Sequence, residues 1–267
     1  MLYNALQIAN PSEITLFRAM TAYFAQNNAN TLIQEHHKHI VSFNCYDPNN
    51  KLTVFNNVRK EICDLLIITY STQNKLVRAT FLQAKYTKNV YQNPFRFHGD
   101  VFQWLLLAQR PQINDNNKNP LPQDILSSAL LNSIGSFGVF YKDNGSIDFG
   151  FSTADSIGYY SRTPFSSKNT HKILSFRNKK IQYSFNKMFI DLQTSYGANY
   201  FEQALYKMQV GCPICNITIQ NLLSAYYLSH KGIKRMFDSL GILPRSTTLA
   251  NPSSFNNILI VNVDAQD

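Results

Sequence analysis

Apolar residues along the chain follow two kinds of spacing, one typical of helices and one typical of strands. Residues 12–39 carry apolar side chains at roughly helical intervals behind a proline-serine start signal, which predicts helix. A cluster of asparagines near residue 28 interrupts this stretch, so we expect two helices there. Residues 39–45 and 52–55 have strand-like patterns on either side of a polar turn.

The next segment predicts a β-hairpin followed by a helix. Residues 62–70 are apolar and β-branched except for Asp64, which is typical of a buried strand. A polar turn at 71–75 leads into a second strand-like run at 76–87. Residues 99–110 then have the pattern of a helix that ends before a proline.

The second half of the chain predicts further strands and helices. Residues 137–141 and 147–151 flank an Asp-Asn-Gly turn, which is a strong hairpin signal. Helical spacing recurs at 200–209 and 218–239, and 258–263 is strand-like. We therefore expect an α/β (α+β) fold with a mixed central sheet flanked by helices.

Composition and charge narrow the class of protein. The chain has 267 residues, of which 44% are apolar, so it has enough apolar material for a packed core. It lacks a run of about 18 apolar residues and a leader-like start, which predicts a cytoplasmic protein that does not enter a membrane. Its net charge of +9 favours a polyanion as partner, although some proteins are basic for no specific reason.

Three polar residues stand out in the predicted hairpin at 62–87. If the turn centres near residues 73 and 74, Asp64 lies opposite position 84 or close to it. Gln83 and Lys85 share one face of the returning strand because side chains alternate. The Asp64 carboxylate, the Gln83 amide oxygen and the Ala84 carbonyl are the oxygen donors that hard divalent cations prefer. Lys85 adds a positive charge suited to phosphodiester hydrolysis.

These residues resemble the signature of the PD-(D/E)XK nuclease superfamily. Its members carry an aspartate on one hairpin strand and Glu-x-Lys on the next, between a helix that can bear a glutamate and a following helix. The resemblance implies Asp64 and Gln83 as metal ligands, Lys85 as the catalytic lysine and Glu35 as an optional fourth member. Glu61 is a competing candidate for that last place. Two positions depart from the pattern, since Cys63 replaces the proline and Gln83 replaces the acid.

The resemblance also implies an activity and an architecture. It implies a restriction-endonuclease-like fold that hydrolyses DNA phosphodiesters with Mg²⁺. Within the superfamily the chain looks most like a type II restriction endonuclease, which acts on double-stranded DNA and is a homodimer when it cuts a symmetric site. We expect residues 1–155 to form the nuclease core and residues 156–267 to form a basic, aromatic elaboration packed on it.

Several alternatives remain open at this stage. One alternative is the nuclease subunit of another anti-phage defence system that depends on a partner protein. Two others are a nucleic-acid-binding protein that has lost its metal and a nuclease that acts on RNA. In the least specific interpretation, Gln83 and Lys85 are solvated residues at the end of a strand and Asp64 caps a turn.

Two further groups of residues could carry function. Residues 156–190 contain no acid and many aromatics, so we expect their basic side chains to contact nucleic acid. They are Arg162, Lys168, Lys172, Arg177, Lys179, Lys180 and Lys187. Cys212 and Cys215 form a CxxC motif, but no second pair of ligands accompanies it, so packed thiols are favoured over a zinc site.

Overall fold

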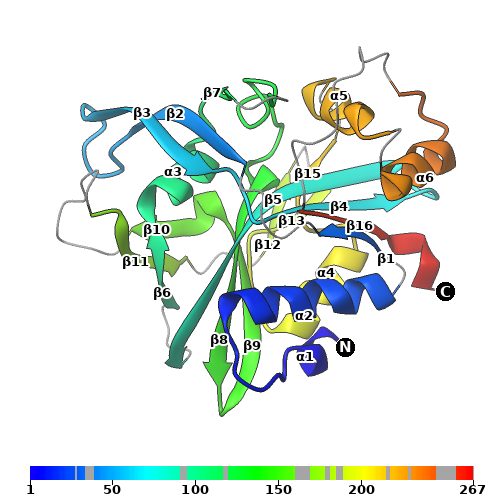
Figure 1. The fold of residues 1–267 in the computed structure, drawn as a ribbon, viewed down its shortest axis with the longest axis horizontal. Coiled ribbons are helices and arrows are strands. Elements are labelled where there is room, and N and C mark those ends of the chain that lie inside the picture. Colours follow the sequence, from blue (N-terminus) through cyan, green and yellow to red (C-terminus); the bar gives the residue numbers. More distant parts are fainter. Residues whose placement is uncertain are drawn as a thin grey trace.

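The computed structural model is a mixed α/β structure built on a central mixed sheet (Figure 1). It describes residues 1–27, 29–33, 39–90, 95–116, 120–159, 169–177, 181–184, 189–214, 217–227, 230–244 and 257–266. Among these residues the central sheet has eight strands, in the order β1-β16-β4-β5-β8-β9-β14 with β15 paired to β5. No helix in the described part of the chain is long and apolar enough to cross a membrane.

The elements have the following bounds. The helices are α1 (Leu2–Ala5), α2 (Glu13–Gln26), α3 (Val101–Gln109), α4 (Ala198–Tyr206), α5 (Ile217–Ala225) and α6 (Lys231–Leu240), with short 3₁₀ turns η1 (Asn132–Ile134), η2 (Ala154–Ser156) and η3 (Val263–Gln266). The strands of the central sheet are β1 (Ala29–Ile33), β4 (Leu65–Ser71), β5 (Leu76–Val90), β8 (Gly135–Asp143), β9 (Ser146–Thr153), β14 (Thr194–Tyr196), β15 (Cys212–Pro213) and β16 (Asn257–Asn262).

Smaller sheets flank the central one. The strands β3 (Val54–Glu61), β2 (Ile40–Tyr46) and β7 (Ile113–Asn114) form one sheet in that order. A second consists of β10 (Ile157–Tyr159), β11 (His171–Phe176) and β6 (Arg96–Asp100), and β12 (Ile181–Ser184) pairs with β13 (Phe189–Leu192).

The two faces of the central sheet are covered by different helices. In β4, Leu65 and Ile67 pack with α1, α2 and α4, whereas Leu66 and Ile68 pack with α3, α5 and α6. Figure 1 shows these two groups of helices on opposite sides of the sheet. Burial on both faces explains why this strand is continuously apolar instead of alternating with polar residues.

The C-terminal strand occupies an interior place in the central sheet. β16 pairs antiparallel with β1 and parallel with β4, so it separates two strands that come from the first third of the chain. β14 and β15 also join this sheet, through β9 and β5. Residues on both sides of position 155 therefore build one sheet and share its two cores.

Several expected elements are confirmed. The β4–β5 hairpin pairs from Leu65↔Leu82 to Ser71↔Leu76, and β8–β9 closes over the Asn-Gly turn. The helix expected at 99–110 is α3, which begins after Asp100 because that carboxylate accepts hydrogen bonds from the Phe102 and Gln103 N–H groups.

The prediction of a second helix within residues 12–39 is wrong for residues 29–33, which the structure describes. α2 ends at Gln26, and residues 29–33 form β1. The reason is tertiary, because β1 pairs over its whole length with β16, more than 220 residues away along the chain. The helix expected at 218–239 is likewise two helices, α5 and α6, and His230 caps the second one.

Candidate active site

The candidate site lies where β5 runs past the beginning of β4. Continuing the register of the hairpin by one residue places Asp64 opposite Gln83, one position from the expected partner. The Asp64 N–H donates to the Leu82 carbonyl at 2.9 Å, and its Oδ2 accepts from the Ala84 N–H at 2.7 Å. Asn257 Nδ2 donates to the Asp64 carbonyl at 3.0 Å, so the C-terminal strand also holds this residue.

Lys85 lies between two carboxylates. Its Nζ is 3.9 Å from Asp64 Oδ2 and 3.8 Å from Glu13 Oε1. The Lys85 side chain is only 16% exposed, whereas Glu13 is 45% exposed. Both distances exceed normal hydrogen-bond lengths, so the ammonium is attracted to the two acids without being locked to either.

Glu13 reaches this site from the start of α2. Ser12 caps that helix, since its Oγ accepts from the Thr15 N–H and the Thr15 hydroxyl accepts from the Ser12 N–H. This capping box fixes the first turn, and with it the position of Glu13. An acid in the first turn of a helix is also favoured by the helix dipole, so the sequence pattern alone gave Glu13 no special role.

Gln83 is completely buried on β5. Its Nε2 donates to the Glu61 carbonyl at 3.3 Å, and its Oε1 has no hydrogen-bond partner among the described residues. Leaving a buried amide oxygen unpaired costs about 1–3 kcal/mol, so such an atom calls for an explanation. Because Gln83 is buried and Lys85 is mostly buried, the interpretation of a solvated strand end is wrong.

The oxygen donors at this point suit a hard divalent cation. Mg²⁺ keeps several of its waters and takes one or two carboxylates from a protein, which Asp64 and Glu13 supply. The unpaired Gln83 Oε1 offers a further neutral oxygen. The described residues contain no group of three or more His, Cys, Asp or Glu side chains that could hold a metal ion, so the donor set depends on this amide oxygen and on waters.

Sequence analysis offered two glutamates, Glu35 and Glu61, as the optional fourth member of the site. Glu35 lies outside the described residues. Glu61 ends β3 opposite Ile40, and its main-chain carbonyl contacts the Gln83 amide. Among the described residues, the helix that precedes the hairpin is α2, and it brings Glu13 Oε1 to 3.8 Å from Lys85 Nζ.

Only two of the predicted nucleic-acid contacts can be placed. Lys172 is half-buried on β11, and Arg177 is exposed directly after that strand. Their sheet also exposes His98 on β6 and His171 on β11. The other five, Arg162, Lys168, Lys179, Lys180 and Lys187, lie outside the described residues.

The cysteines that are described are packed thiols. Cys45, Cys63 and Cys212 are buried, and none of these three is in a disulfide bond. Burial raises the pKa of Cys45 to about 12 and that of Cys63 well above its usual value, so both stay protonated at neutral pH. Cys212 Sγ accepts from the Leu131 N–H and donates to the Pro213 carbonyl, as expected for a packed thiol, and Cys215 lies outside the described residues.

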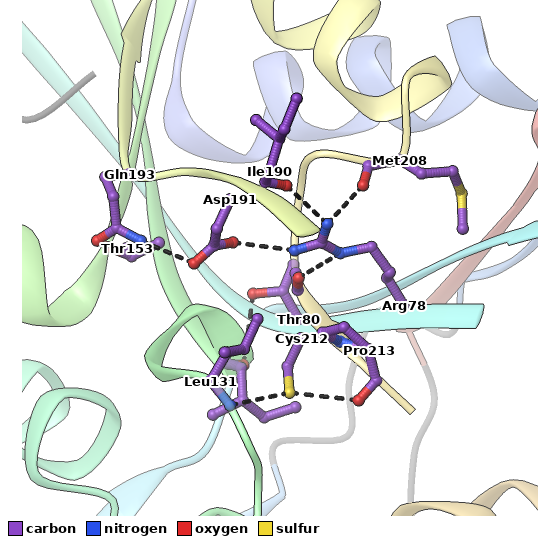
Figure 2. A network of polar contacts seen from close by, with 12 residues as sticks. Arg78, Thr80, Leu131, Thr153, Ile190, Asp191, Gln193, Met208, Cys212 and Pro213 are labelled. Carbon is purple, nitrogen blue, oxygen red and sulfur yellow. Dashed lines mark hydrogen bonds and ion pairs between the residues drawn. The ribbon is translucent and has the colours of Figure 1, made fainter. Parts of the chain in front are cut away.

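A second polar cluster, centred on Arg78, lies further along β5 (Figure 2). Arg78 is 1% exposed and donates to the carbonyls of Gly211, Ile190 and Met208 and to the Asp191 carboxylate. Every donor nitrogen of this guanidinium thus makes a hydrogen bond, which joins β5 to β13 and to the segment between α4 and β15.

Comparison of this chain with protein-family models, with curated proteins and with solved structures finds no match.

Proposed function

We propose that this protein is a Mg²⁺-dependent DNA endonuclease of the type II restriction class. The observation that carries the proposal is the Lys85 ammonium held within 4 Å of both the Asp64 and the Glu13 carboxylates, on the strand that also carries Gln83 and its unpaired amide oxygen. Asp64 on one hairpin strand precedes Gln83 and Lys85 on the next, which is the order of the nuclease signature. Glu13 would be the acid that comes from the helix before the hairpin. The net charge of +9 suits a double-stranded DNA substrate.

In the proposed mechanism Asp64, Glu13 and Gln83 would hold the cation. When bound, Mg²⁺ lowers the pKa of a water molecule and neutralises charge on the phosphate. The Ala84 N–H keeps the Asp64 carboxylate in place, at 2.7 Å from Oδ2. Lys85 would stabilise the charge that develops on the phosphate oxygens while the water forms one P–O bond, the bond to the leaving oxygen breaks, and the proton that the water loses ends on that leaving oxygen. The products are a phosphate monoester and a hydroxyl group.

Cleavage of unmodified plasmid and phage DNA tests this proposal. The purified protein should give discrete fragments with Mg²⁺ and none with EDTA. Replacing Lys85 with alanine should slow cleavage about 100- to 1000-fold, because one preorganised charge is lost from the reacting phosphate. Lys142→Ala is the matched control, since Lys142 is an exposed lysine at the far end of β8 and should leave the rate unchanged. Equal rates for Lys85→Ala and the parent protein would contradict the proposal.

Gln83 favours a second candidate function, a nucleic-acid-binding protein or a defence subunit that cuts only with a partner. A site with glutamine in place of an acid carries one negative charge less and binds cations more weakly. Gln83→Glu separates the two cases. A nuclease should keep its activity or change its metal preference, whereas a pure binder should show neither cleavage nor a response to metal. Competition between matched DNA and RNA duplexes for the protein shows which of the two nucleic acids it binds more tightly.

A further inference from the structure

The hairpin of β2 and β3 has an inner face that α3 covers. The rings of Phe55 and Phe102 meet edge-on with 5.2 Å between their centroids, and Lys60 Nζ lies 6.0 Å over the same Phe102 ring. The Gln109 side chain accepts from the Tyr46 N–H at 2.9 Å and donates to the Tyr46 carbonyl at 2.7 Å. Figure 1 places the hairpin beside α3, at the edge of the molecule. The helix therefore fixes the hairpin from one side.

Strand alternation gives the same hairpin an outer face. Val54 lies opposite Tyr46 in the register, and Asn56 follows Val54 on the same face. A β-bulge at Asn57, which has a φ of +51°, inserts one extra residue and brings Arg59 to this face as well. Tyr46, Val54, Asn56 and Arg59 are all exposed. We call these four residues, with the turn that joins the strands, the outer face of the hairpin.

The charge of the outer face suits a polyanion. Lys51 in the turn and Arg59 on β3 are exposed, and neither side chain makes an ion pair or hydrogen bond with the described part of the chain. Asp47 is the only acid between residues 40 and 60, and its Oδ1 accepts from two main-chain N–H groups of the turn. Glu61, at the other end of β3, is half-buried and has interactions of its own. The two cations are therefore available to phosphates.

The order of residues along the outer face corresponds to the layout of a DNA groove. Lys51 and Arg59 lie at its two ends, and the apolar Val54 and the amide of Asn56 stand between them. A groove likewise has a phosphate backbone on each side and base edges between. The major groove is about 12 Å wide and admits a two-stranded ribbon. Since residues 54 and 59 span at most about 17 Å of strand, Arg59 can reach a backbone while Val54 faces the bases.

We propose that the outer face of the β2–β3 hairpin enters the major groove of duplex DNA, with Lys51 and Arg59 on phosphates and Asn56 on a base edge. The choice of DNA as partner rests on the proposed nuclease function. An asparagine amide pairs bidentately with adenine, and apolar side chains contact the thymine methyl group. Asn56 and Val54 should therefore favour A·T pairs over G·C pairs.

Binding of the full-length protein to two fluorescent duplexes of equal length, one A·T-rich and one G·C-rich, tests the base contact. Anisotropy is followed in EDTA, so that binding is measured without cleavage. The parent protein should bind the A·T-rich duplex about fivefold or more tightly, which is the discrimination that one bidentate base contact supplies. Asn56→Ala should remove this preference. Asn56 is exposed, so its replacement should leave the fold intact.

The salt dependence of the same binding tests the phosphate contacts. Lys51→Ala combined with Arg59→Ala should weaken binding to both duplexes equally and reduce the slope of log K against log salt concentration by about two. Lys142→Ala combined with Lys207→Ala is the matched control, because it removes the same charge from two exposed lysines. These lie near the end of β8 and directly after α4, elements that Figure 1 shows away from the hairpin turn. The control pair should leave the slope unchanged.

The outcomes separate this inference from the nuclease proposal. Equal binding of the two duplexes by the parent protein, no binding, or a slope that falls as much in the control pair overturns the groove assignment even if the protein cuts DNA. A hairpin variant that changes the apparent mass in gel filtration and not DNA binding also overturns it, since the face would then dock a second copy of the chain. Hairpin-dependent binding without Lys85-dependent cleavage supports the inference, and only the nuclease proposal falls.

Discussion

Arg78 is a charged side chain that is fully buried in the core, so its charge has to be compensated by other groups. Its partner Asp191 is buried as well, and its second oxygen accepts from Gln193 Nε2 at 2.7 Å. Gln193 in turn accepts from the hydroxyls of Thr153 and Ser156. Burial raises the pKa of Asp191 to about 7, against the opposing effect of the Arg78 guanidinium. The network thus compensates for a large loss of hydration at both charges.

Removing both members of this pair should be less damaging than the two single losses added together. Asp191→Ala leaves a buried guanidinium without its counter-charge, and we expect a loss of about 3–5 kcal/mol in the free energy of unfolding. Arg78→Leu combined with Asp191→Ala should cost less than the sum of the single changes. Urea unfolding of the four proteins measures this. Strictly additive losses would show that the two charges do not interact.

His230 should make the stability depend on pH. Its Nδ1 accepts from the N–H groups of Gly232 and Ile233 at the start of α6, so the ring must be neutral there. Burial lowers the pKa of His230, so below pH about 6.5 the unfolded chain takes up a proton that the folded chain does not. The contribution to stability is therefore full above that pH and is lost as the pH falls through the lower, folded-state value.

The measurement is urea unfolding between pH 5 and pH 8. His230→Asn keeps a cap but removes the titrating group, so the free energy of unfolding should vary less with pH than in the parent protein. Ser12→Ala is the control, because it removes the cap of α2 without removing a titratable group and should lower stability by a similar amount at every pH. An unchanged pH dependence in His230→Asn would contradict this role.

At the scale of elements, the length of β5 creates the candidate site. β4 begins at Leu65, opposite Leu82, while β5 continues to Val90 along β8. Among the described residues, the part of β5 beyond Leu82 thus has a sheet partner on one side only. Asp64 and the start of α2 fill the other side, which is why a buried amide, a lysine and two acids can meet next to an apolar sheet.

The approach of β15 to β5 requires a glycine. Gly211 has a φ of +87°, and a Cβ there would lie 2.7 Å from the Ala79 carbonyl oxygen. Gly145 has a similar φ of +85° in the β8–β9 turn but open space around it. Gly145→Ala should therefore cost only about 1–2 kcal/mol for the left-handed conformation. Gly211→Ala should cost more, because the Ala79 main chain must also move. Comparable losses in urea unfolding would contradict this account.

For the whole molecule, the interior position of β16 makes the two halves of the chain interdependent. A fragment of residues 1–155 lacks β14, β15 and β16, so β4 loses the strand beside it and Ile67 and Leu66 lose part of their cover. We expect this fragment to show no cooperative unfolding transition, by circular dichroism, under conditions where the full chain shows one. A fragment that unfolds cooperatively would mean that residues 1–155 form an independent domain.

The sequence pattern predicted those residues of the candidate site that lie close together along the chain. Asp64, Gln83 and Lys85 lie within one hairpin, and strand alternation with a short polar turn was enough to bring them together. The register expected for Asp64 was one residue off, because the position of a turn centre cannot be read from composition alone. Glu13 could not be found in this way, since it reaches Lys85 from a helix some 70 residues earlier in the chain.

The sequence by itself determined the hairpins β4–β5 and β8–β9, the helix α3 after its Asp100 cap, and the buried character of the central strands. These depend on side-chain period, turn residues and caps, which act over a few residues. Only the tertiary structure decided that residues 29–33 are a strand, that β16 enters between β1 and β4, and that Glu13 faces Lys85. Each of these depends on a partner far along the chain. Such pairing is decided only when the local elements pack together, because it depends on which sheet edges and helix ends are still uncovered.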